Sequence, residues 1–70
     1  MAEQVNAPSI LRRKQVEART GLSRSTIYLR IARGEFPAQV SLGRRAVGWS
    51  SNSIDEWITD RIAQSRKAPA

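Results

Sequence analysis

Residues 20–34 of the chain, TGLSRSTIYLRIARG, decide the fold. Ser23 is a favourable N-cap residue, because its hydroxyl can accept a hydrogen bond from a free backbone N–H in the first turn. Gly34 suits the position just after a helix, and Pro37 follows shortly beyond it. The stretch therefore predicts a helix of about residues 24–33.

A second, shorter helix is expected before this one, over about residues 13–19, with Gly21 as its end. Its core side chains are predicted to be Ile10, Leu11 and Val16. Two helices joined by a three- or four-residue turn that contains Gly have the form of a helix-turn-helix.

The two faces of the helix at residues 24–33 differ in chemistry. At about 100° per residue, Ile27 and Ile31 share one side with Tyr28 close by, which predicts a buried stripe. The residues expected on the opposite, exposed side are Ser25, Thr26, Leu29 and Arg33.

The exposed side carries groups that suit the major groove of DNA. Hydroxyls contact bases or phosphates, an apolar side chain can meet a thymine methyl group, and Arg can bridge guanine O6 and N7. Arg24 and Arg30 are better placed for phosphates. A solvated helix face is the competing interpretation.

Residues 38–49 change to a period of two, which is typical of strands and predicts an antiparallel hairpin. Pairing Leu42 with Val47 also pairs Val40 with Trp49. This register places all four apolar side chains on one face, which must pack on the helices.

Arg44 and Arg45 are expected at the tip of that hairpin. Two adjacent arginines repel each other, so an anion is the favoured partner. A wing that follows a phosphate backbone or enters a narrow minor groove would supply one. An ordinary basic loop tip is the alternative.

Residues 51–66 predict the last helix, since its apolar residues recur at helical spacing. Its N-cap is ambiguous: Ser53 begins a capping-box pattern, but Ser50 or Ser51 could cap a helix that starts one turn earlier. The predicted buried stripe consists of Ile54, Trp57, Ile58 and Ile62.

Composition narrows the possible functions. The chain has 70 residues, no Cys and no His, which excludes disulfides, Cys- or His-ligated zinc and catalysis by either residue type. The net charge is +6, and the sequence pI is about 11.4. Residues 10–45 hold nine cations against two acids, whereas residues 46–70 hold three of each. Such a basic segment is typical of nucleic-acid binders, although a generic basic surface would also keep a small protein soluble.

The chain is expected to form one domain at residues 10–67, with flexible ends at residues 1–9 and 68–70. No segment approaches the roughly 20 apolar residues of a membrane span, and none resembles a signal peptide. A cytoplasmic, nucleoid-associated location is therefore expected.

Four motifs in order carry a family resemblance: GLSRSTIY at residues 21–28, GEFP at 34–37, LGRRAVGW at 42–49 and IDEW at 54–57. Together they resemble the AlpA family of small phage and prophage regulators, over about residues 10–63. The family is similar to excisionases and to the DNA-binding domain of MerR regulators.

The resemblance implies a mainly α fold with a small β-hairpin, a winged helix-turn-helix. It also implies a sequence-specific DNA-binding transcriptional regulator of a phage, prophage or other mobile element. The alternative is an excisionase-like architectural factor that directs recombination together with an integrase.

By the same resemblance, the recognition helix contains Arg24, Ser25, Thr26 and Tyr28, and the wing tip is formed by Arg44 and Arg45. Many relatives carry a basic or polar residue at the position of Leu29, so their base preference does not carry over. The full predicted DNA-binding set is Arg12, Arg13, Arg24, Ser25, Thr26, Tyr28, Leu29, Arg30, Arg33, Arg44 and Arg45.

The expected partner is double-stranded DNA, with integrase or RNA polymerase as further partners and no membrane. The sequence predicts no metal, cofactor or catalytic residue, and no enzyme, because it shows no phosphate-binding glycine loop and no converging carboxylates. A monomer that pairs or binds cooperatively on DNA is expected.

An RNA-binding module is less favoured, because few aromatic residues remain for stacking. The acidic face of the last helix suits an additional protein contact.

Overall fold

The computed structural model describes residues 8–67, so residues 1–7 of the tail predicted at residues 1–9 and all of the end predicted at residues 68–70 lie outside it. Among residues 8–67, no helix is both long enough and apolar enough to cross a membrane. The elements in chain order are β1 (Ile10–Leu11), α1 (Arg13–Thr20), α2 (Arg24–Ala32), β2 (Val40–Gly43), β3 (Ala46–Ser50) and α3 (Ser51–Lys67).

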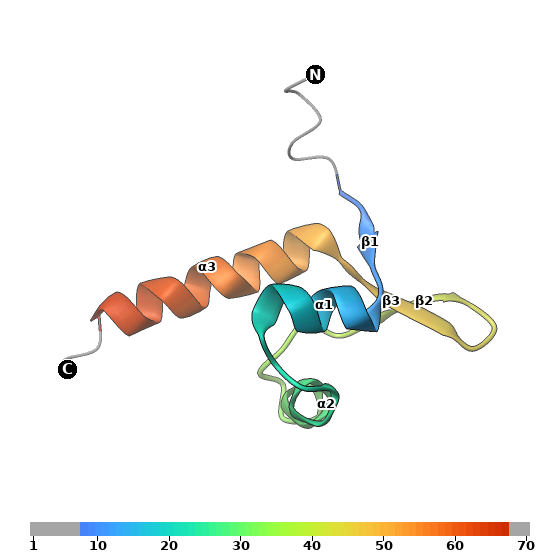
Figure 1. The fold of residues 1–70 in the computed structure, drawn as a ribbon, viewed down its shortest axis with the longest axis horizontal. Helices are drawn as coiled ribbons and strands as arrows, with labels where there is room; N and C mark the ends of the chain where they lie inside the picture. The colour runs from blue at the N-terminus through green and yellow to red at the C-terminus, as the bar shows by residue number, and fades with distance from the viewer. Residues whose placement is uncertain (1–7, 68–70) are drawn as a thin grey trace, which may run out of the picture.

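The predicted helix-turn-helix is confirmed, and its boundaries have local causes. Gly21 ends α1 in the left-handed region, at φ 76°. The Ser23 hydroxyl accepts a hydrogen bond from the backbone N–H of Thr26 at 3.2 Å and so caps α2. Gly34, at φ 73°, follows the end of α2. Figure 1 shows α1 lying across the view and α2 end-on below it, so the two helices cross.

The fold class is confirmed as mainly α with a small antiparallel sheet, although the sheet has three strands instead of two. The strand order is β1-β3-β2, with Leu11 opposite Trp49 and Ile10 opposite Ser50. The sequence did not predict β1. Because neighbouring strand residues point to opposite faces, Leu11 is buried while Ile10 is 46% exposed. The prediction that Ile10 is a core residue was therefore wrong.

The predicted hairpin register holds only beside the turn. There Gly43 lies opposite Ala46, as predicted, but an irregularity at Leu42 shifts the pairing beyond it. An inserted residue of this kind leaves two residues of one strand opposite one of the other. The pairs nearer the base of the hairpin are Val40 with Gly48 and Ser41 with Val47.

This shift overturns the prediction that four apolar side chains share one face. Moving the register by one residue reverses which face of a strand is buried. Trp49 therefore points into the core, whereas Val40 and Leu42 lie on the other side of the sheet and are 41% and 42% exposed.

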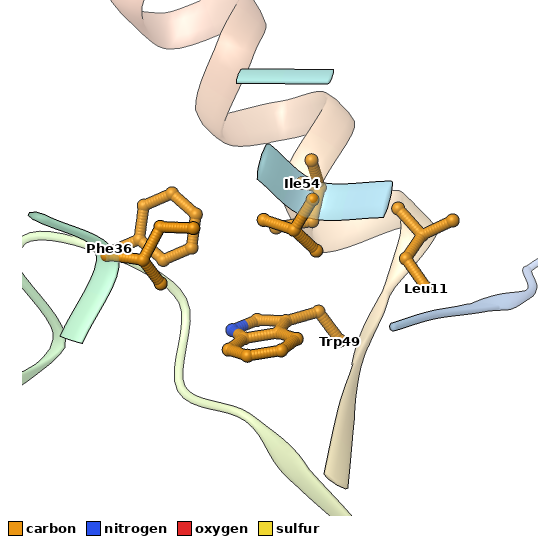
Figure 2. Packing of buried hydrophobic residues seen from close by; sticks show 6 residues of the cluster. Leu11, Phe36, Trp49 and Ile54 are labelled. Atoms are coloured by element: carbon orange, nitrogen blue, oxygen red, sulfur yellow. The ribbon is translucent and has the colours of Figure 1, made fainter. Parts of the chain in front are cut away.

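Trp49 is at the centre of the core. Its indole is fully buried, and its Nε1 donates a hydrogen bond to the Pro37 carbonyl at 3.0 Å. Figure 2 shows the indole below Ile54, with Phe36 on one side and Leu11 on the other. The buried apolar residues are Leu11, Val16, Ile27, Phe36, Trp49 and Ile54.

The start of α3 resolves the capping ambiguity. The helix begins at Ser51, and the Ser50 hydroxyl accepts a hydrogen bond from the Ser53 backbone N–H at 3.5 Å. Ser51 has a different role, because its buried hydroxyl accepts a bond from the backbone N–H of Ser9 at 2.9 Å. This contact ties the segment before β1 to the first turn of α3.

The far half of α3 departs from the predicted buried stripe. Ile54 is buried, and Trp57 and Ile58 are half-buried against the core, but Ile62 is 48% exposed. Figure 1 shows that the last turns of α3 run beyond the end of α1, where none of the other helices and strands of the described residues lies below them. The prediction that Ile62 is buried was therefore wrong.

A first prediction concerns Gly48, whose missing side chain allows β1 and β3 to approach. A Cβ there would lie 2.5 Å from Cγ2 of Ile10 and 2.9 Å from the Leu11 carbonyl oxygen. Gly48→Ala should lower the free energy of unfolding by about 1–3 kcal/mol, since the backbone must shift. Urea denaturation measures this change.

The double variant Ile10→Ala/Gly48→Ala is the control, because it removes the side-chain clash and keeps the backbone clash. Gly48→Ala should therefore lower the free energy of unfolding by less when it is added to Ile10→Ala than when it is added to the wild-type protein. Unchanged stability of Gly48→Ala would contradict the close approach of the strands.

Candidate nucleic-acid interface

The two faces of α2 are separated as predicted. Ile27 is fully buried and Ile31 is half-buried, whereas Ser25 and Arg33 are exposed and Leu29 is 50% exposed. Thr26 is half-buried, and its hydroxyl takes part in the N-cap, since the Ser23 hydroxyl donates to it at 3.0 Å. The outward face of α2 thus presents two polar groups around one apolar side chain.

Tyr28 belongs both to the core and to the surface. It is half-buried, and its ring meets Trp49 edge-on with centroids 6.3 Å apart. The Arg24 guanidinium lies 6.0 Å from the centroid of the same ring. Packing on Trp49 therefore fixes a tyrosine whose outer side faces cationic residues.

Tyr28 also lines a basic pocket, which brings together the start of α1, the middle of α2 and the wing, meaning the β2–β3 hairpin. The pocket has a volume of about 320 Å³. Its lining residues are Arg12, Arg13, Lys14, Tyr28, Arg45 and Val47.

Hydrogen bonds hold the start of α1 against the wing. The Arg12 side chain donates from Nε to the Val47 carbonyl at 3.1 Å, across 35 positions of sequence. The Arg12 backbone N–H donates to the Gln15 side chain at 2.8 Å, which closes the first turn of the helix. Arg13 forms an ion pair with Glu17, one turn further along α1. The hydrogen bond from Arg12 to Val47 therefore holds the start of α1 and strand β3 of the wing together at the basic pocket.

The wing tip presents both predicted arginines to solvent. Arg44 and Arg45 form the turn between the strands and are exposed. Arg45 has φ 59°, a left-handed conformation that is uncommon for residues other than glycine. Arg45 is also one of the residues that line the basic pocket.

Apart from Arg13, the cations that line the basic pocket have no carboxylate partner within residues 8–67. Within residues 8–67, the ion pairs are Arg13 with Glu17 and Arg19 with Asp55. The first turns of α1 and α2 contain no acid, although the positive end of the helix dipole favours one there. Arg30 is different, because it is half-buried in the last turn of α2, where a cation stabilises the helix. A cluster of cations with so few acidic partners favours the binding of an anion from outside the protein.

The pocket contains one cation that the sequence-based set omitted, Lys14. It was counted in the basic segment but not assigned to the interface. The sequence contained a local indication that Lys14 belongs to the interface, because Arg13 and Lys14 occupy the first turn of a helix that has no acidic residue there. Arg33, the C-cap of α2, is not among the residues that line the pocket.

An acidic groove of about 480 Å³ lies elsewhere, between α3 and the loop that follows α2. Its acidic lining residues are Glu35, Glu56 and Asp60. The Trp57 Nε1 donates to the Glu35 carbonyl at 3.0 Å, and the Arg61 guanidinium lies 5.2 Å from the centroid of the Trp57 ring. The basic and acidic side chains thus gather at two separate places on the domain.

Comparison with known proteins relates this sequence to a family of prophage regulatory proteins. Residues 9–62 match the model of the family described as Prophage CP4-57 regulatory protein (AlpA). A protein of Enterobacteria phage P4, named uncharacterized protein ORF88, is 47% identical over 57 residues. That match spans 81% of this chain and 65% of the phage protein, slightly less than two thirds of its length.

A second relative has a functional name. The DNA-binding transcriptional activator AlpA of Escherichia coli (strain K12) is 37% identical over 62 residues. The match covers 80% of this chain and 89% of the relative.

Proposed function

The chain belongs to the AlpA family of prophage regulatory proteins, and we propose that it binds double-stranded DNA sequence-specifically and regulates transcription for a phage, prophage or other mobile element. The observation that carries this proposal is the convergence of unneutralised cations from α1, α2 and the wing around Tyr28. The name of the Escherichia coli relative supports it.

In this proposal α2 is the recognition helix and lies in the major groove. Its outward side chains are small hydroxyls, one exposed leucine and an arginine, a set that can contact bases. Leu29, at 50% exposure, is the apolar group available to a thymine methyl. The proposed base-contacting residues are Ser25, Thr26, Leu29 and Arg33.

The remaining cations are proposed to position the protein on the DNA backbone. The wing arginines Arg44 and Arg45 contact the backbone or the neighbouring minor groove, and Arg24 and Arg30 contact phosphates. Arg12, Arg13 and Tyr28 complete the backbone contacts on the basic pocket. RNA polymerase or an integrase is the proposed protein partner, and the protein is proposed to be a monomer before it binds DNA.

Salt dependence tests whether binding is driven by phosphate contacts. With the six proposed backbone cations and Lys14 of the basic pocket on phosphates, log affinity should fall against log salt concentration with a slope of about −6. Fluorescence anisotropy with a duplex selected from a random pool gives this slope. A slope close to zero would contradict binding through the cationic surface.

Side-chain substitutions test the proposed division between backbone and base contacts. Arg45→Ala should weaken binding to selected and random duplexes alike, because phosphates carry no sequence information. Thr26→Ala and Arg33→Ala should alter the preference among sequences. Both classes are compared by selection from the same random pool.

The stability of Thr26→Ala is measured in parallel, since the Thr26 hydroxyl also accepts a hydrogen bond from the hydroxyl of Ser23, the N-cap of α2. Equal losses on selected and random duplexes for all three variants would contradict the division.

A further inference from the structure

We propose that the basic pocket is a preformed site for one phosphate group, and that this group, supplied by the DNA backbone, joins the wing to the helix-turn-helix. The inference rests on the proposed function for the source of the phosphate. The pocket itself is a property of the protein alone, so the two can be tested separately.

Charge is the first argument. Four cationic side chains line the pocket, and only Arg13 among them has a carboxylate partner within residues 8–67. Arg13 and Lys14 also occupy the first turn of α1, where cations oppose the helix dipole. An anion in the pocket would relieve both the mutual repulsion of the cations and the unfavourable placement beside the dipole.

Preorganisation is the second argument. Arg12 is bound through Nε to the Val47 carbonyl, which orients its guanidinium and leaves Nη1 and Nη2 as further donors. Tyr28 is fixed by its contact with Trp49 and carries a hydroxyl that can donate. A ligand therefore meets two donors, Arg12 and Tyr28, whose side chains are already held by the fold, which lowers the cost of ordering them.

The chemistry of the donors is the third argument. Guanidinium groups match the oxygen geometry of phosphate, and lysine adds a compact charge. The donors also come from three separate elements: Arg12 and Lys14 from the start of α1, Tyr28 from α2 and Arg45 from the wing. A tetrahedral oxyanion presents several acceptor atoms and can bind all three elements at once. Occupation of the pocket would thus fix the wing relative to α2.

Titration of the free protein with sodium phosphate tests the pocket without DNA. Backbone amide resonances are followed by NMR, with sodium chloride holding the ionic strength constant. Residues 13–15 and 44–46 should shift and saturate, whereas residues 59–66 of α3 should not shift. Unsaturable shifts, or shifts spread evenly over all cations, would overturn the proposal.

Two substitutions make the test specific. Lys14→Gln and Arg45→Asn should each weaken phosphate binding about tenfold, the loss expected for a charge-assisted hydrogen bond of about 1.4 kcal/mol. Asn at position 45 tolerates the left-handed backbone, so the turn is retained. Arg66→Gln, which removes an exposed cation at the far end of α3, is the matched control and should leave phosphate affinity unchanged.

Duplexes with a single neutral methylphosphonate locate the same contact on DNA. At one position of the DNA backbone, the methylphosphonate should reduce the affinity of the wild-type protein for the duplex about tenfold. The same methylphosphonate should not change the affinity of Lys14→Gln, which has already lost the contact. Duplex binding with no saturable phosphate binding would overturn the pocket and leave the proposed function intact. Phosphate binding by a protein that binds no duplex would instead overturn the proposed function.

Discussion

The burial of the Trp49 indole is the constraint on which the rest of the structure depends. A domain of this size has one small core, and Trp49 lies at its centre in contact with residues from the helices and the neighbouring strand. Its only polar atom is satisfied by the Pro37 carbonyl, which fixes the loop between α2 and β2. Because strand side chains alternate, the inward position of Trp49 also leaves Gly48 on the outer face, where Ile10 can approach.

The same residue connects the core to the candidate interface. Tyr28 packs edge-on against Trp49 and presents its other side to the basic pocket. Val47, two positions before Trp49, provides the carbonyl that binds Arg12. The arrangement of cations is therefore a consequence of core packing, and a protein that loses this packing should also lose the pocket. The acidic residues gather instead beside Trp57, in a separate groove.

The sequence predicted α1 and α2 well, because Gly21, Ser23 and Gly34 determine the backbone at the ends of these helices. It also predicted the turn at Arg44 and Arg45. Errors arose where distant elements decide the outcome. The bulge at Leu42 shifts the hairpin register, and β1 forms only because β3 offers a free edge to Ile10 and Leu11. Ile62 follows the helical period of the stripe, yet it is exposed on the far half of α3. Lys14 was omitted because only the folded domain places it in one pocket with Arg45 and Val47 of the wing.

Photo-cross-linking from single cysteines tests most directly whether the basic side of the domain faces DNA. The chain has no Cys, so Ser25→Cys on α2 and Ser65→Cys on α3 each provide one attachment point for a photoactivatable group. Both serines are exposed. With a duplex selected from a random pool, the account predicts cross-links from position 25 and none from position 65. Cross-links from position 65 with none from position 25 would contradict it.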